Sequence, residues 1–192
     1  MSAVSKGRFV EEVRRKTRDL HVELEKVLGL EHIVSSREDY VEVLRKFYSV
    51  WKPLEDLLRQ SSLRDERGLN LENRLRASRI SDDLSYLGKD PSTVPFFDFE
   101  WETLTAAEAT GILYVLEGST MGGAVISRRL REDLAISPSE GGSFFAGHGE
   151  HNREMWQEYL AWAEKSLPTE QISSATVSAE RVFELLIRCF RQ

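Results

Sequence analysis

The sequence has 192 residues, of which 41% are hydrophobic and 30% charged, and its formal net charge is −6. These values predict a single globular domain over residues 1–192, and the net acidity argues against a general nucleic-acid-binding protein. The single cysteine excludes an internal disulfide and a cysteine-rich zinc site, and with neither a signal-like apolar core nor a run of about 18 apolar residues we expect a cytoplasmic protein without a membrane span.

The first amphipathic helix is predicted over residues 5–28. Apolar side chains recur there at helical spacing, opposite a charged side; they are Phe9, Val13, Leu20, Leu24 and Leu28. A second helix is predicted over 37–60, because Ser36 followed by Asp39 resembles a capping box. Pro53 lies inside this second segment and is expected to bend or divide the helix.

A third helix is expected over 71–88, ending at Gly88, and the segment KDPSTVPFFDFEW follows it. Two prolines and several aromatic residues indicate that this segment is an ordered, non-helical crossing. The residues from Thr105 to Glu108 form a capping box and begin a long helix that contains the sequence EGSTMGG.

The C-terminal part of the chain predicts further helices. Residues 137–140 supply an N-cap serine and a proline at the first helical position, and the two glycines that follow would keep this helix short. Longer helices are predicted at about 149–166 and 169–190, and strand signals are nearly absent throughout. The sequence therefore predicts an all-α fold with a single core.

Glycines are unusually frequent in the middle of the long helix. Each costs roughly 1 kcal/mol relative to alanine inside a helix, so the bare backbone must serve a purpose. At about 100° per residue, Gly111, Gly118 and Gly122 share one stripe, and Gly123 borders it. Such a stripe permits close packing against a second helix or the approach of a flat ligand, and adjacent glycines also permit a kink.

The four histidines differ in what their surroundings indicate. His32 follows a helix end and is interpreted as a surface or capping residue. His148 and His151 have H-x-x-H spacing, but flanking glycines and the lack of an evident third ligand favour a turn over a metal site. His21 lies mid-helix beside apolar residues, where it is either a partly buried structural histidine or an iron ligand.

Polar residues around His21 suit a ligand site of this kind. Thr17 and Glu25 each lie one turn from His21, and Glu25 could orient the ring by bonding its second nitrogen. Arg14 and Arg18 project from about the same side, where guanidinium groups can receive carboxylates as forked pairs. A solvated helix face is the alternative interpretation of these arginines.

These motifs together resemble the haem oxygenase family. The segments TRDLHVELE, LYVLEGSTMGG and FFAGHGEHNREMWQEY occur in the family's order, and the spacing of the helical segments agrees over nearly the whole chain. The chain looks most like the bacterial biliverdin-producing type, including members associated with bacterial phytochromes. The resemblance implies a single helical bundle with a haem cleft between the first helix and a kinked, glycine-bearing helix.

The resemblance also implies the two faces of the haem site. His21 takes the position of the proximal iron ligand. Gly118, Gly122 and Gly123 take the positions of the glycines whose backbone packs over the distal face of the haem. Thr17 and Glu25 are expected beside the haem on the proximal helix.

Further positions follow from the same resemblance. Arg14 and Tyr114 match residues near the haem propionates, and Arg153 corresponds loosely to a basic residue on a later helix. Ser119 stands where animal members have an aspartate, as it commonly does in bacterial members, and together with Thr120 it is expected to hold the distal water chain that delivers protons. The absence of histidine, aspartate and arginine from residues 118–123 suits a distal side without a strong acid or base.

The reaction implied is oxidative opening of haem to biliverdin, with release of carbon monoxide and ferrous iron. Haem is then both substrate and cofactor, O2 and reducing equivalents are needed, and the protein supplies binding, orientation and protons. The chain has no dinucleotide fingerprint and no cysteine cluster, so a ferredoxin or a flavin reductase is expected as electron donor. Residues 127–131, with Arg74, Arg76 and Arg79, could form a basic docking patch for it.

Three other interpretations fit part of the pattern. A haem carrier or sensor on the same fold would bind haem without turnover. A related helical fold that handles a thiamine-like molecule would need a cysteine nucleophile, whereas Cys189, close to the C-terminus, is interpreted as a packing residue. A purely structural helical module would explain the periodicity and leave the glycines to helix packing.

Overall fold

The computed structural model describes residues 8–29, 33 and 35–192, so the interpretation of His32 lies outside the described residues. No strand occurs in the described part of the chain, which agrees with the all-α prediction. Within these ranges, five short 3-10 helices connect the longer elements: η1 (Ser62–Asp65), η2 (Leu71–Arg74), η3 (Pro91–Thr93), η4 (Gly149–His151) and η5 (Thr169–Gln171). The α-helices are α1 (Arg8–Leu28), α3 (Arg37–Gln60), α4 (Ala77–Tyr86), α5 (Ala106–Leu134), α6 (Ser143–Ala146), α7 (Asn152–Ser166) and α8 (Ile172–Arg191).

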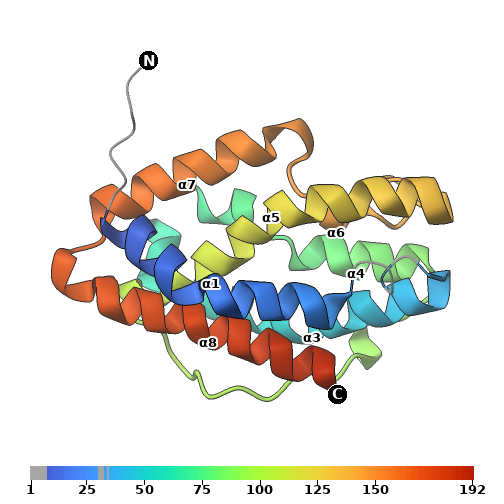
Figure 1. Cartoon of the computed structure of the whole chain (residues 1–192), viewed down its shortest axis with the longest axis horizontal. Coiled ribbons are helices and arrows are strands. Elements are labelled where there is room, and N and C mark those ends of the chain that lie inside the picture. The colour runs from blue at the N-terminus through green and yellow to red at the C-terminus, as the bar shows by residue number, and fades with distance from the viewer. Residues whose placement is uncertain (1–7, 30–32, 34) are drawn as a thin grey trace.

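The C-terminal helix α8 contacts both of the helices that carry the candidate functional site. It packs against both α1 and α5, and Figure 1 shows α8 running beside α1 for most of its length. Helix α7 lies against α5 and α1, while α3 and α4 pack on each other. The core between these helices is apolar, and Trp51, Tyr40 and Tyr159 are its largest fully buried side chains.

Local capping fixes where the first long helices begin. The Ser36 hydroxyl accepts a hydrogen bond from the backbone N–H of Asp39 at 3.0 Å, which confirms the predicted start of α3. Pro53 lies inside α3, which continues on both sides of it, so the proline does not divide the helix. Near the start of α1, the backbone N–H of Val10 donates to the Glu164 carboxylate of α7 at 2.6 Å.

The prediction of one helix over 71–88 is wrong at its start. The chain forms η2 and then extends at Leu75, and α4 begins only at Ala77. A buried carboxylate causes this restart: Glu55 of α3 accepts hydrogen bonds from the backbone N–H groups of Arg76 at 2.6 Å and Ala77 at 2.9 Å. These bonds satisfy donors that a helix N-terminus leaves unpaired, and they fix the position of Arg76.

Replacing Glu55 with glutamine tests this cap. Burial raises the pKa of Glu55, although two backbone N–H donors and the nearby Arg76 charge oppose the shift. A carboxyl group with a higher pKa in the folded state holds more protons folded than unfolded, so wild-type stability falls as pH rises from the unfolded pKa to the folded pKa. Glutamine does not titrate, so we expect the free energy of unfolding of Glu55→Gln, relative to wild type, to increase with pH above about 4.5. Urea denaturation at several pH values measures this difference, and a pH-independent difference would contradict the account.

The remaining helix boundaries agree with those predicted from the sequence, with one exception. Thr105 and Glu108 form the predicted capping box at the start of α5, with both reciprocal hydrogen bonds present. Residues 137–140 form a turn rather than a helix, because the backbone N–H groups of Glu140 and Gly142 both donate to the carbonyl of Ser137, at 3.0 and 3.1 Å. The chain reverses there, and α7 and α8 lie close to their predicted ranges.

By length and composition helix α5 is apolar enough to cross a membrane, although it contains no uninterrupted run of 18 apolar residues. Its most apolar 18-residue window is 61% buried inside the protein. Aliphatic residues such as Ile112, Leu113 and Leu116 make this helix apolar, and they are buried in the core. We therefore interpret α5 as a core helix.

Candidate functional site

A cavity of about 550 Å³ opens between α1, α5 and α8. This volume lies within the range of pockets that bind small molecules and cofactors, which are typically apolar with a few polar groups. Helix α1 contributes Arg14, Thr17, His21, Leu24, Glu25 and Leu28 to its lining. Helix α5 contributes Tyr114, Val115, Gly118, Ser119, Met121, Gly122, Gly123, Val125 and Ile126.

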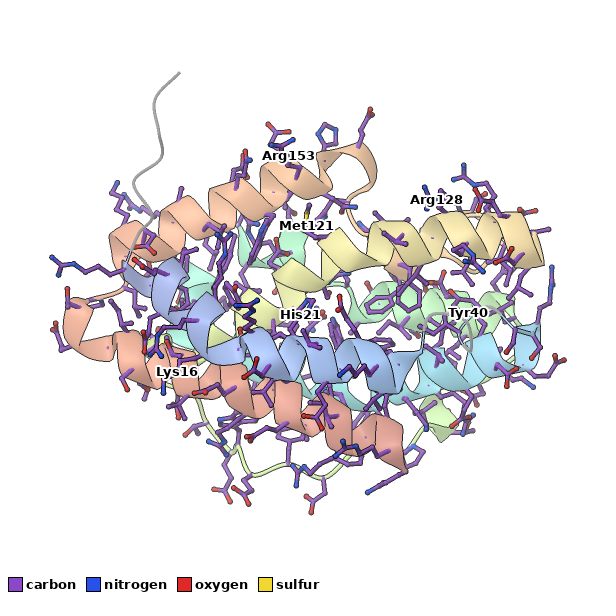
Figure 2. The ribbon with its side chains drawn as sticks, in the orientation of Figure 1. Lys16, His21, Tyr40, Met121, Arg128 and Arg153 are labelled. Carbon is purple, nitrogen blue, oxygen red and sulfur yellow. The ribbon has the colours of Figure 1, made fainter. Side chains whose placement is uncertain are left out.

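His21 is one of the polar residues of the α1 wall. Its side chain is 59% exposed, and because it lines the cavity, part of this exposed surface faces the cavity. Figure 2 shows His21 on the side of α1 that faces α5. The ring packs edge-on against Phe183 of α8, with 5.8 Å between ring centroids, and Nδ1 lies 3.5 Å from Glu25 Oε1. This contact turns Nδ1 toward the carboxylate and leaves Nε2 as the nitrogen for a ligand.

Arg14 and Tyr114 meet at the same cavity from opposite helices. Tyr114 is buried on α5, where its ring packs against Phe9 and Trp156 at centroid distances of 5.9 and 5.2 Å. Burial raises the pKa of Tyr114, and the Arg14 guanidinium beside it opposes this shift. Arg18 is not part of the lining, so α1 presents one of its two candidate arginines to the cavity.

The glycines of α5 serve two different purposes. A Cβ atom on Gly111 would lie 1.8 Å from the carbonyl oxygen of Ala175, and one on Gly123 would lie 2.8 Å from the carbonyl oxygen of Phe145. These two glycines therefore permit close packing of α8 and α6 against α5. A Cβ atom on Gly122 would meet nothing within 4 Å, so Gly122 exposes bare backbone to the cavity.

Gly118 combines both purposes. A Cβ atom there would touch the Trp156 ring at 3.4 Å, and the residue also lines the cavity. Figure 1 shows α5 changing direction about halfway along its length, as expected for a helix with closely spaced glycines. The single stripe inferred from the sequence is therefore divided between helix packing and the cavity.

Ser119 and Thr120 point to different places. The Ser119 hydroxyl lines the cavity and donates to the carbonyl of Leu116 at 2.6 Å. The Thr120 side chain is buried, donates to the carbonyl of Glu117 at 2.7 Å and is not part of the lining. Back-bonding of this kind is the usual behaviour of threonine inside a helix, and it removes Thr120 from the positions that could hold water in the cavity.

The sequence analysis missed Arg76 as a site residue. Its side chain reaches the cavity wall, where Nη2 donates to Ser119 Oγ at 2.6 Å. Burial lowers the pKa of Arg76 to about 10, against the raising effect of the Glu117 and Glu55 carboxylates. The absence of charge within residues 118–123 therefore does not make this wall uncharged. The contact joins Arg76 and Ser119, which lie 43 positions apart in the sequence, so no local sequence motif predicts it.

Arg74, Arg76 and Arg79 do not join residues 127–131 in the expected basic docking patch. Arg74 and Arg76 are buried, and Arg74 Nη1 donates to Glu117 Oε2 at 2.8 Å. Arg79 is half-buried and donates to the carbonyl of Gly147. The guanidinium groups of these three arginines are hydrogen-bonded to carbonyl oxygens and carboxylates within the fold. Arg128, in contrast, is exposed on α5, as Figure 2 shows.

Arg153 also lies outside the cavity. It is exposed near the start of α7 and is not part of the lining, and Figure 2 shows it well separated from His21. The loose alignment that suggested it therefore places no basic group in the site.

The remaining candidate ligands and nucleophiles have structural partners. His148 lies in the predicted turn, with Nε2 3.5 Å from Glu117 Oε1, while His151 contacts Glu154 at 3.1 Å. Among the described residues, no group of three metal-ligating side chains occurs. Cys189 is buried with its sulfur 3.6 Å from Ser49 Oγ, which agrees with a packing role and leaves the thiamine-related interpretation without a nucleophile.

The cavity fits a flat macrocycle such as haem. One wall offers an imidazole whose Nε2 is not held by Glu25, and another wall includes Gly122, beside which there is open space. Exposed apolar side chains of Met121 and Val125 extend this second wall, and Arg14 supplies a positive group for a carboxylate.

Comparisons with known proteins agree with this geometry. A family model described as heme oxygenase matches residues 7–192. A heme oxygenase from Neisseria meningitidis, solved with NO and CO bound, superimposes with a TM-score of 0.83 at 21% identity, covering 98% of this chain and 92% of that one. Heme oxygenase 2 from Chlamydomonas reinhardtii, solved without heme, gives a TM-score of 0.77 at 16% identity, covering 95% of this chain and 96% of that one. No curated protein sequence matches significantly.

Proposed function

This chain belongs to the haem oxygenase family, and on that premise we propose that it opens haem to biliverdin in the cavity between α1 and α5, as the bacterial biliverdin-producing enzymes do. One observation carries the assignment of the site: the imidazole of His21 and the Cβ-free backbone at Gly118 and Gly122 line the same cavity of about 550 Å³. A flat ring bound there would lie between the imidazole and the part of α5 that has no Cβ atoms at Gly118 and Gly122.

On the proximal side, His21 would hold the iron through Nε2. Glu25 approaches Nδ1 at 3.5 Å and, by accepting its N–H, selects the tautomer that leaves Nε2 free. The Phe183 ring supports the imidazole from α8. A neutral imidazole ligand favours oxygen binding without the strong electron donation of a thiolate.

On the distal side, the backbone of α5 restricts the space beside the ring. Bound haem supplies both the iron at which oxygen is activated and the carbon that is oxidised. The missing side chains at Gly118 and Gly122 would let the haem lie close to the backbone of α5, and Gly123 lets α6 pack against the same helix. Ser119 lines the same cavity, where its hydroxyl would hold a water that supplies protons to the reaction.

Arg14 anchors a haem propionate, so replacing Arg14 with methionine should change both the affinity for hemin and the position at which the haem ring is opened. Loss of one charged hydrogen bond is expected to weaken hemin binding by roughly tenfold, and the loosened ring gives a changed ratio of biliverdin isomers. Hemin titration and HPLC of the products measure the two effects. Arg18→Met, on the same helix but outside the cavity lining, is the matched control. Equal affinity and isomer ratio in Arg14→Met and wild type would contradict the role.

Reducing equivalents come from an external partner, because the sequence has no dinucleotide fingerprint and only one cysteine. A ferredoxin or a flavin reductase is the proposed donor. Val125 lines the cavity, and the exposed Arg128 follows it along α5 by about one turn, with Arg131 also exposed further on. These arginines offer an acidic donor a docking surface close to the haem.

Turnover with a chemical or ferredoxin-linked reductant tests the function. The protein is mixed with hemin and reductant in air, and the absorption spectrum is followed. The enzyme is expected to lose its Soret band while a broad red biliverdin band grows. A stable Soret band under reducing conditions would instead identify a haem carrier or sensor.

A further inference from the structure

We infer that Arg76 is a positioning residue for the distal side, holding Ser119 as a hydrogen-bond acceptor and placing a positive charge beside a bound ligand. The inference deepens the proposed function and rests on its haem site. Arg76 comes from the segment between η2 and α4, far in sequence from the glycine-bearing helix. It is 2% exposed, yet it lines the same cavity as His21.

The Arg76 guanidinium is held in place from several directions. Nη2 donates to the carbonyl of Leu116 and to Ser119 Oγ, and Nη1 donates to the carbonyl of Phe144 at 3.4 Å. The guanidinium carbon lies 5.2 Å from the centroid of the Phe144 ring. With the backbone N–H of Arg76 also bound to Glu55, the side chain has little freedom to leave the cavity wall.

These contacts determine what the Ser119 hydroxyl can offer. A hydroxyl has one hydrogen to donate and two lone pairs to accept with. The Ser119 hydroxyl donates its hydrogen to the carbonyl oxygen of Leu116 at 2.6 Å, and one of its lone pairs accepts a hydrogen bond from Arg76 Nη2 at 2.6 Å. One lone pair of the hydroxyl remains, so Ser119 can accept, but not donate, a hydrogen bond with a water or ligand in the cavity.

Arg76 supplies the positive counterpart. The group stays charged at neutral pH even though burial lowers its pKa to about 10. The nearby carboxylates of Glu117 and Glu55 offset part of this charge, and Arg79 adds to it. Nε of Arg76 has no acceptor within the described part of the chain, so the guanidinium is not saturated by the fold. In a cavity with apolar walls, a charge of this kind acts strongly on a ligand.

The two residues thus act in opposite directions on a distal ligand. The Arg76 charge stabilises negative charge that builds up on the ligand, whereas the Ser119 lone pair favours the hydrogen of a water. An ordered water between them would be oriented by both groups. The sequence alone suggested that Ser119 works without a charged neighbour, and the pairing with Arg76 replaces that view.

The C–O stretching frequency of the ferrous haem–CO complex tests the inference without turnover. A positive field at the ligand increases back-donation from iron and lowers this frequency, and a lone pair directed at the ligand raises it. We expect Arg76→Met to raise the frequency relative to wild type, and Ser119→Ala to lower it. Azide binding to the ferric form is expected to weaken roughly tenfold in Arg76→Met. Arg67→Met, an exposed arginine outside the lining, serves as the control and keeps the wild-type frequency.

Each result decides a separate claim. A wild-type frequency in folded, haem-loaded Arg76→Met would overturn the inference. If Arg76→Met does not fold, Ser119→Ala still decides, because a rise in its frequency would show that the hydroxyl donates to the ligand. Failure of the wild-type protein to form a histidine-ligated haem–CO complex would overturn the proposed haem site itself.

Discussion

Replacing His21 with alanine is expected to abolish haem turnover and to change the Soret spectrum of the hemin complex. The variant lacks the proposed iron ligand, and the loss of activity should exceed the roughly 10- to 100-fold that removal of a mere orienting partner costs. Folding should be unaffected, because the His21 side chain is 59% exposed and has the Phe183 ring and Glu25 as its neighbours. Hemin titration, the Soret spectrum and the turnover rate measure the effect, and added imidazole should partly restore the wild-type spectrum.

His151 offers a matched control for this substitution. Its side chain is similarly exposed and also contacts a glutamate, Glu154, but it does not line the cavity. His151→Ala should therefore bind hemin and turn it over as the wild type does. An unchanged spectrum and affinity in His21→Ala would remove His21 as the ligand.

Replacing Gly122 with leucine is expected to block haem binding while leaving the fold intact. The side chain would extend into open space beside the helix, and leucine is a better helix former than glycine by up to about 1 kcal/mol. Steric conflict with a bound ring should weaken hemin affinity on the order of 10- to 100-fold. Hemin titration and thermal unfolding of the same variant separate the two effects.

The neighbouring Ala124 provides the control for the added bulk. Ala124 is exposed on the same helix and does not line the cavity, so Ala124→Leu should keep both haem affinity and stability. Wild-type hemin affinity in Gly122→Leu would mean that the ring does not lie against this part of α5.

Most features that depend on residues close in sequence were predicted correctly, and the helix start expected at residues 137–140 is the exception. The caps at Ser36 and Thr105 are recognised by side chains three positions away, and both begin helices where expected. The turn around His148 likewise follows from its glycine neighbours. Helical spacing also places His21 and Arg14 on one face of α1, and both line the cavity.

Features that depend on distant partners could not be predicted in this way. The start of α4 is set by Glu55, a residue of α3, and the charge on the distal wall comes from Arg76. Helical spacing gave Gly111 and Gly122 the same stripe, but α8 packs against one and the cavity opens beside the other. Helical spacing predicts which residues share a face of a helix, whereas tertiary packing determines which residues or cavities that face contacts.

A crystal structure of the hemin complex tests the central claim most directly. We expect His21 Nε2 at coordination distance from the iron, with the opposite face of the ring against the backbone of Gly118 and Gly122. A propionate should lie beside Arg14, and Arg76 should remain bonded to Ser119. Iron ligated by another residue, or a haem bound outside the cavity between α1 and α5, would contradict the account.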